Sequence, residues 1–202
     1  MIKIGITGGV GCGKSRVLSY LGEHTKSRIL LADEVAHLVK EPGTQCYHRL
    51  VELLGVQILT EDGSIHREKM AELIFGNEGI LKQVNEILHP AVKAYILEAM
   101  KVEEEAGKTA VFFLEAALLI EAGYLPWLDE LWYIYSDEEV RRKRLRESRN
   151  YSEEKILQIM EKQLKEEEFR KYAGVVIDNS KEFTWTCRQL EKEARRLQIW
   201  QD

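Results

Sequence analysis

A glycine-rich stretch near the start of the chain constrains the fold most. Residues 8–15 read GGVGCGKS, which fits the spacing G-x-x-x-x-G-K-[ST]. An apolar strand is expected before it, over residues 2–6, and a helix after it, through Val17, Leu18 and Leu21. A strand–loop–helix unit of this kind curls main-chain N–H groups around phosphate oxygens at a helix N-terminus. The sequence therefore predicts a site for a nucleoside triphosphate, with a glycine-rich turn of no special use as the alternative.

The residues of this loop have distinct expected parts in holding ATP and Mg²⁺. Lys14 is expected to reach the β- and γ-phosphates, and the Ser15 hydroxyl to ligate Mg²⁺. Cys12 is expected to act through its main-chain N–H, which leaves its thiol incidental or a target of oxidation. The full set expected to contact the nucleotide here is Gly9, Val10, Gly11, Cys12, Gly13, Lys14, Ser15 and Arg16.

Composition narrows the class of protein. The 202 residues give room for one α/β domain with an inserted subregion. A net charge of −5 argues against nucleic-acid binding by the whole surface. We find no signal peptide and no apolar run long enough to cross a membrane. Three scattered cysteines, Cys12, Cys46 and Cys187, suggest reduced thiols. We therefore expect a cytoplasmic protein without nucleic-acid or membrane partners, and a monomer, with an oligomer left open.

Acidic residues follow two of the expected strands. Asp33 comes after a strand over residues 28–32, and Glu115 after one over residues 109–114. The carboxyl ends of parallel strands face the ligand crevice, which makes Asp33 a candidate catalytic group and Glu115 a candidate support for Mg²⁺. The alternatives are a helix N-cap at Asp33, for a helix over 34–39, and a salt bridge at Glu115. Glu121 is a further acid near the same crevice.

Residues from 41 to about 107 are expected to form a helical insertion beside the sheet. Helical patterns cover 47–54, 68–75, 80–88 and 91–105, and Gly76, Gly79 and Pro90 punctuate them. Such an insertion is a common place for the second substrate of a P-loop kinase. Arg67 could pair with a substrate phosphate through its planar guanidinium, and His89 opens a helix with Pro90. A solvated surface arginine and a structural histidine are the alternatives.

The carboxyl-terminal part of the chain is expected to add two strands and a lid. After a strand over 131–135, residues 141–149 are rich in arginine, and helical periodicity continues to Leu164. A basic helical hairpin could close over ATP and offset charge on the transferred phosphoryl group, although a solvated face or a nucleic-acid contact is the general alternative. A strand over 174–177 leads to Asn179, which could hydrogen-bond an adenine edge. A final helix over about 182–197 is expected to pack on the sheet.

The order of these motifs resembles that of the dephospho-coenzyme A kinase family over nearly the whole chain. The resemblance implies a P-loop kinase fold in which a five-stranded parallel sheet is flanked by helices. It implies a single domain over 1–202, with a core of 1–40, 108–136 and 173–202, a helical acceptor region of about 41–107 and a lid of about 137–172. The motifs that carry it are residues 6–15, 32–33, 41–43, 62–67, 89–90, 118–121, 144–145, Gln163 and 177–179.

The resemblance also implies the reaction and the roles of individual residues. The γ-phosphoryl group of ATP would pass to the ribose 3′-hydroxyl of dephospho-coenzyme A, giving coenzyme A and ADP. Asp33 matches the family's candidate base, which orients the acceptor hydroxyl or takes its proton. Lys14 and Mg²⁺ would neutralise phosphate charge, and Arg144 matches an arginine of the lid. On the acceptor side the corresponding residues are Arg67, His89 and Glu121, while Asn179 matches the residue near the adenine.

Five positions depart from the family pattern. They are His37 for arginine, Glu115 for aspartate, Ala117 for proline, Ser148 for arginine and Gly174 for aspartate. These departures concern acceptor contacts and lid geometry, and they leave Lys14, Ser15 and Asp33 unchanged. We expect a divergent, working enzyme.

Other classes of protein remain as alternatives. Another small-molecule or nucleoside monophosphate P-loop kinase is the nearest, although such kinases often carry proline where this loop has Val10 and Gly11. A switch GTPase would need N-K-x-D and D-x-x-G motifs, and neither is found. A catalytically degenerate protein could bind nucleotide and use the basic helix as an interface.

Overall fold

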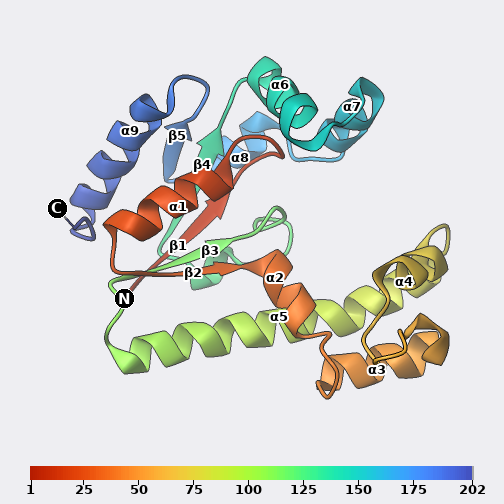
Figure 1. Ribbon diagram of the computed structural model, residues 1–202. Helices are drawn as coiled ribbons and strands as arrows, with labels where there is room; N and C mark the ends of the chain where they lie inside the picture. Colours follow the sequence, from red (N-terminus) through yellow and green to blue (C-terminus); the bar gives the residue numbers. More distant parts are fainter. Residues whose placement is uncertain (202) are drawn as a thin grey trace. The chain divides into compact units, whose positions relative to one another are not determined.

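The computed structural model describes residues 1–201, and the chain forms two compact units (Figure 1). The first unit joins Met1–Leu30 to the chain from Glu103 onward, and the second is Leu31–Val102. The boundary at Leu31 places Asp33 in the second unit, whereas the sequence analysis assigned residues 1–40 to the core.

A five-stranded parallel sheet forms the centre of the first unit, as predicted. Its strand order is β2-β3-β1-β4-β5, and parallel pairing joins β1 to β3 and β4, and β4 to β5. Burial on both faces explains why β3 and β4 are nearly continuous apolar runs. The strands are β1 Ile2–Thr7, β2 Ser27–Leu31, β3 Val111–Glu115, β4 Glu130–Tyr135 and β5 Val175–Asp178.

The register of the sheet fixes the edge at which a ligand can bind. Ile6 in β1 lies opposite Glu115 in β3, and Thr7 lies opposite Tyr133 in β4. The carboxyl ends of these three strands therefore meet at one edge, and the glycine-rich loop leaves β1 there. In open parallel sheets this edge is the usual ligand-binding crevice.

Helices cover the sheet of the first unit. α1 packs beside α9, where the Tyr20 ring meets Phe183 edge to face (Figure 1). α8 packs on β4, and the rings of Tyr133 and Phe169 stack at 4.8 Å. The elements are α1 Lys14–His24, η2 Leu125–Trp127, α6 Glu138–Arg149, α7 Glu153–Glu161, α8 Glu166–Tyr172 and α9 Phe183–Arg196.

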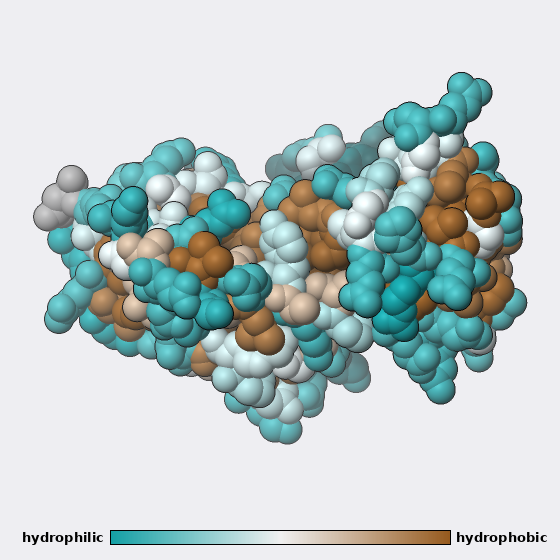
Figure 2. Space-filling view, turned by 90° about the horizontal axis from the view of Figure 1, so that it is seen from below, coloured by the Kyte–Doolittle hydropathy of each residue, from teal (hydrophilic) through white to brown (hydrophobic). Residues whose placement is uncertain are grey.

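The second unit is helical, as the sequence predicts for most of it. The Thr44 hydroxyl caps α3 by accepting a hydrogen bond of 3.0 Å from the Tyr47 main-chain N–H. Figure 2 shows the face along which α5 runs, where apolar patches lie among hydrophilic side chains. The elements are α2 Ala32–Leu38, α3 Gln45–Leu54, η1 Val56–Ile58, α4 Arg67–Ile74 and α5 Glu78–Ala106, whose last turn belongs to the first unit.

One expectation and one alternative reading about helix ends are wrong. Residues 80–88 and 91–105 form the single helix α5, which contains Pro90, so His89 and Pro90 do not open a helix. An interior proline costs about 3 kcal/mol, and the burial of one apolar stripe along the whole of α5 outweighs it here. α2 begins at Ala32 with Leu31 as its N-cap, so Asp33 lies in the first turn and does not cap the helix. A carboxylate in the first turn still stabilises a helix, because it interacts favourably with the positive end of the helix dipole.

No helix within residues 1–201 has the length and apolar character needed to cross a membrane.

Candidate active site

The glycine-rich loop joins β1 to α1 at the ligand edge of the sheet. Gly13 adopts a left-handed conformation with φ of 89° immediately before Lys14, the first residue of α1. A side chain at Gly13 would be strained by this φ and would also collide with the Asn179 amide nitrogen. Glycine is therefore required here both by the backbone turn and by the close approach of the segment after β5.

The carbonyl groups of the loop are turned outward and held by protein donors. The Cys12 oxygen accepts hydrogen bonds from Asn179 Nδ2 at 2.8 Å and from Ser136 Oγ at 3.2 Å. The Val10 oxygen accepts one from Arg141 Nε at 3.0 Å. In a trans peptide the next N–H points opposite to the carbonyl, so the N–H groups of Gly11 and Gly13 face the other side of the loop. This is the arrangement that binds phosphate oxygens.

Lys14 is held at the rim of the loop by two oxygen partners. Its ammonium donates to the Gly8 oxygen at 2.9 Å and lies 3.4 Å from Glu115 Oε1. Both side chains are largely buried, with 13% of Lys14 and 15% of Glu115 exposed. The pairing of Ile6 with Glu115 explains the contact, because it brings the end of β3 level with the start of the loop. Glu115 therefore forms the salt bridge considered as its alternative role, and its partner is the phosphate-binding lysine.

The oxygen donors near the loop fit Mg²⁺. Ser15 lies exposed in the first turn of α1, and Glu115 ends β3. Hydroxyl and carboxylate oxygens are hard ligands, and Mg²⁺ usually takes only one or two of them from protein beside phosphate and water. No cluster of three or more histidine, cysteine or acidic side chains suited to a metal occurs within residues 1–201. This loop can therefore offer Mg²⁺ a site with one or two protein ligands.

Arg144 lies behind the loop. Its Nη2 donates to the Asn179 oxygen at 2.8 Å, and its Nη1 donates to Ser136 Oγ at 3.1 Å and reaches the Cys12 oxygen at 3.4 Å. Burial, with a smaller effect of the nearby Arg16 charge, lowers the pKa of this guanidinium. These oxygens belong to the loop or to the residues that support it, so Arg144 stabilises the shape of the loop.

Arg141, one helical turn before Arg144, lies over the loop itself. Its guanidinium is so close to Gly9 that a Cβ on this glycine would collide with it. Its Nη2 donates to Gln163 Oε1 at 2.6 Å, and the same oxygen accepts the Val10 N–H at 3.2 Å. The sequence patterns assign no individual role to Arg141 or Gln163. The one sequence signal for a role of Arg141 is its spacing of three residues from Arg144, which places both side chains on one side of α6.

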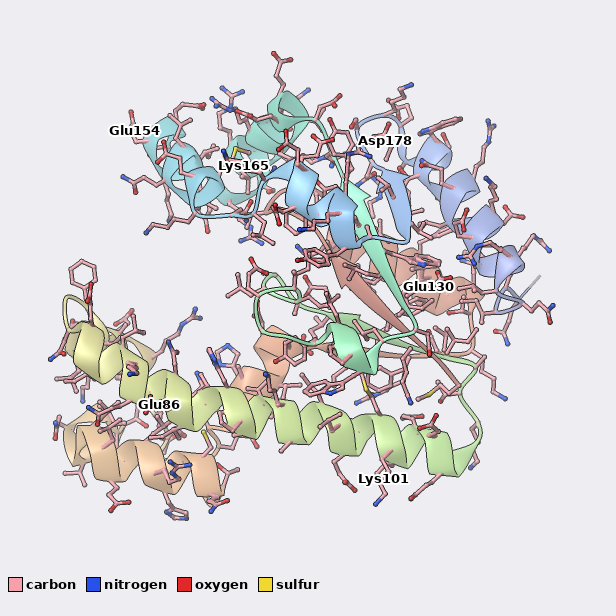
Figure 3. The ribbon with its side chains drawn as sticks, turned by 180° about the vertical axis from the view of Figure 1, so that it is seen from behind. Glu86, Lys101, Glu130, Glu154, Lys165 and Asp178 are labelled. Atoms are coloured by element: carbon pink, nitrogen blue, oxygen red, sulfur yellow. The ribbon has the colours of Figure 1, made fainter. Side chains whose placement is uncertain are left out.

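Asn179 is a structural part of the site. Its side chain is buried, with Nδ2 bonded to Cys12 and Oδ1 accepting from Thr186 Oγ1 at 2.9 Å. Its main-chain N–H donates to Tyr135 at 2.8 Å. The preceding Asp178 ends β5 beside the start of α9 (Figure 3). Both polar atoms of the amide have protein partners, so the side chain supports the loop, and a hydrogen bond from Asn179 to an adenine edge stays a prediction.

Two other expected residues of the first unit are exposed. The Arg16 guanidinium lies over the Phe183 ring, 3.8 Å from its centroid. Glu121 lies in the turn that follows β3. The structure thus gathers Lys14, Ser15 and Glu115 at the loop, while Glu121 is exposed in its turn.

The expected acceptor residues belong to the second unit. Asp33 is exposed in the first turn of α2. Arg67, at the start of α4, lines a cavity of about 210 Å³ together with His37 and Lys40. His89 lines a different cavity of about 560 Å³ along α5, to which Glu86 also contributes (Figure 3). The structure therefore places Arg67 and His89 in the linings of two different cavities.

Several known proteins are similar to this chain over nearly its whole length. A family model described as dephospho-CoA kinase matches residues 2–184. A protein of Streptococcus mutans named dephospho-CoA kinase is 35% identical over 196 residues, which cover 96% of this chain and 97% of the relative. A crystal structure of a Thermus thermophilus protein, 27% identical, superposes with a TM-score of 0.80 over 96% of both chains. The dephospho-CoA kinase from Campylobacter jejuni, 24% identical over the same shares, shares the fold with a TM-score of 0.71.

Proposed function

This chain belongs to the dephospho-CoA kinase family, and from that premise we propose that it transfers the γ-phosphoryl group of ATP to the ribose 3′-hydroxyl of dephospho-CoA. The products are CoA and ADP, and the reaction is the last step of CoA biosynthesis. The enzyme is a kinase with the P-loop kinase fold.

The observation that carries the proposal is the phosphate loop with Lys14 at its rim. The outward carbonyls of Val10 and Cys12 leave N–H groups for the phosphates, and the Lys14 ammonium supplies a positive charge at the γ-phosphate end. Phosphoryl transfer depends mainly on positioning and on charge stabilisation of this kind.

Asp33 orients the acceptor hydroxyl and takes its proton. A hydroxyl is a weak nucleophile at neutral pH, and a carboxylate that accepts its proton both orients it and raises its reactivity. Asp33 is exposed at the start of α2, where its carboxylate is accessible to an acceptor. Arg67 and His89 are candidates for contacts with the rest of the acceptor, and Glu121 is a weaker one.

Ser15 and Glu115 would hold Mg²⁺, which neutralises charge on the β- and γ-phosphates when bound. Glu115 is the longer acid at a position where the family usually has aspartate, and its contact with Lys14 shows that its carboxylate reaches the rim of the loop. Main-chain N–H groups from Gly9 to Arg16 would contact the phosphates, although in this structure those of Val10 and Cys12 donate to Gln163 Oε1 and to the Gly9 oxygen. Lys14 keeps its charge directed at the group that is transferred.

Different parts of the chain bind the nucleotide and the acceptor. The sheet and the loop bind ATP, residues 41 to about 107 bind dephospho-CoA, and residues 137–172 form the lid. ATP and dephospho-CoA are the small-molecule partners, without nucleic acid or membrane. We propose a cytoplasmic location and a monomer.

A steady-state assay with several acceptors tests this function. ADP release from Mg-ATP is measured with dephospho-CoA, AMP, CMP, adenosine and no acceptor. We expect turnover with dephospho-CoA alone. Turnover with a nucleoside monophosphate instead would assign the chain to another small-molecule kinase, and ATP binding without any turnover would indicate a catalytically degenerate protein.

A further inference from the structure

A small cavity in the second unit is lined by three basic side chains. It has a volume of about 210 Å³, and Arg67, Lys40 and His37 line it together with one carboxylate, that of Glu41. Lys40 follows α2, and Arg67 begins α4, so two separate elements bring positive charge to the same space. The whole cavity lies within residues 37–70 and therefore inside one compact unit.

The lysine and the arginine that line this cavity are not paired with a protein anion within residues 1–201. Within residues 1–201, neither the Lys40 ammonium nor the Arg67 guanidinium forms a hydrogen bond or an ion pair. Lys40 is partly buried, and burial together with repulsion from Arg67 lowers the pKa of its ammonium. Arg67 is exposed, so the unfavourable charge is that of the partly buried Lys40 ammonium beside it, and a bound anion would relieve the repulsion between the two. The cavity thus has the charge of an anion site.

The cavity is close to the proposed catalytic carboxylate along the chain. His37 follows Asp33 by four residues on α2, so the two side chains lie on the same face of the helix, about 6 Å apart along its axis. In dephospho-CoA the 3′-hydroxyl and the 5′-diphosphate are carried by one ribose. An acceptor with its hydroxyl at Asp33 therefore has its diphosphate within reach of the next turn of α2 and of the side chains beside it.

We propose that this cavity binds the diphosphate of dephospho-CoA, with Lys40 and Arg67 as its ionic partners. The inference rests on the proposed function and extends it, because it assigns a specific part of the acceptor to specific side chains. The diphosphate anchors the ribose, so that the 3′-hydroxyl meets the Asp33 carboxylate.

Kinetics of two charge-removing variants test the assignment. We expect Lys40→Gln and Arg67→Gln each to raise KM for dephospho-CoA by about ten- to hundredfold, the loss of one charge-assisted hydrogen bond. KM for ATP and kcat at saturating acceptor stay within about twofold of the native values. Lys40→Arg keeps the charge and restores KM. Lys69→Gln is the matched control, because Lys69 is also on α4 but does not line the cavity.

A binding experiment separates the cavity from the reaction. The protein is saturated with Mg-ADP, which occupies the phosphate loop, and inorganic pyrophosphate is titrated by calorimetry. We expect one further pyrophosphate site in the native protein and in Lys69→Gln, and affinity at least about tenfold weaker in Lys40→Gln and Arg67→Gln.

The outcomes distinguish the two proposals. Turnover of dephospho-CoA with unchanged KM in both variants would overturn the cavity assignment and leave the proposed function standing. Pyrophosphate binding that depends on Lys40 and Arg67, in a protein that does not turn over dephospho-CoA, would support a diphosphate site and reject the proposed acceptor. Equal pyrophosphate binding in all variants would overturn the assignment whatever the acceptor.

Discussion

The side-chain nitrogen of Asn179 donates a 2.8 Å hydrogen bond to the main-chain oxygen of Cys12, which ties the segment after β5 to the phosphate loop. The same amide accepts from Thr186 at 2.9 Å, so α9 is joined to the loop through one buried side chain. The shape of the nucleotide site therefore depends on residues far from it in the sequence.

Replacing Asn179 with alanine is expected to weaken both the fold and ATP binding. The change leaves buried polar groups of Cys12 and Thr186 with fewer partners, which costs about 1–3 kcal/mol of the free energy of unfolding. Chemical denaturation measures the loss, and calorimetry should show weaker binding of Mg-ATP. Thr186→Val removes the hydrogen bonds to Asn179 Oδ1 and to the Asp178 oxygen but keeps the bond from Asn179 to Cys12, so it is expected to lower stability with a smaller effect on ATP. Equal ATP affinity in Asn179→Ala and the native protein would contradict the supporting role.

Arg141 is expected to act on the γ-phosphate, because its guanidinium lies over Gly9 and bonds to Val10 at the start of the loop. Arg141→Gln should lower kcat by about 10²–10³, the usual loss when one donor to developing charge is removed. It should also weaken binding of ATP more than binding of ADP. Arg146→Gln, a more exposed arginine on the same helix, serves as the control. A uniform loss of affinity for both nucleotides would instead indicate a structural role.

Asp33→Asn tests the proposed base. The amide keeps the size of the side chain but cannot accept the hydroxyl proton, so kcat should fall by about 10²–10⁴ while ATP affinity is retained. Glu34→Gln, the next residue of α2, is expected to leave kcat unchanged. Full activity of Asp33→Asn would mean that another group activates the acceptor.

The affinity for dephospho-CoA is expected to fall as pH rises through the lowered pKa of Lys40. Burial, with Arg67 nearby, shifts this pKa below its ordinary value of 10.5, so the ammonium loses its proton earlier than in an unfolded chain. In that window the unfolded state binds more protons, so the stability of the unliganded protein rises with pH while anion binding weakens. His37, Glu41, Cys46 and Arg67 also face Lys40.

Lys40→Arg identifies the group responsible. Arginine stays charged throughout this pH range, so KM for dephospho-CoA in this variant should become flat with pH. The same pH dependence in Lys40→Arg and in the native enzyme would assign the titration to a different group.

The Cys12 thiol is expected to react slowly with alkylating agents. It is buried, and burial raises its pKa, so little reactive thiolate forms near neutral pH. Cys187 is partly accessible and should be labelled first. Mass spectrometry after a short exposure to iodoacetamide distinguishes the two. Preferential labelling of Cys12 would contradict the prediction that its thiol is unreactive.

The fold could be predicted from the sequence because its signals are local. The loop spacing, the apolar runs and the turn residues identified the five strands and most helices to within a few residues. Pro90 misled the prediction, since the buried stripe of α5 outweighs the local cost of an interior proline. Asp33 could be placed next to the end of β2, but whether it caps α2 depends on the exact first residue of that helix.

The candidate site could be predicted only in part, for a different reason. Lys14 and Ser15 belong to a continuous motif, whereas the partners of Asn179, Arg144 and Gln163 come from distant segments. Spacing alone cannot show that Arg144 supports the loop from behind while Arg141 lies over it. These assignments depend on how α6 and β5 meet the loop in three dimensions.

The identity of the product tests the central claim most directly. The native protein is incubated with dephospho-CoA and ATP labelled in the γ-phosphoryl group, and the product is analysed by mass spectrometry and phosphorus NMR. We expect the label in CoA as a monoester of the ribose 3′-oxygen, with one ADP formed for each CoA. Label found only in inorganic phosphate, or on a different acceptor, would contradict the proposed function.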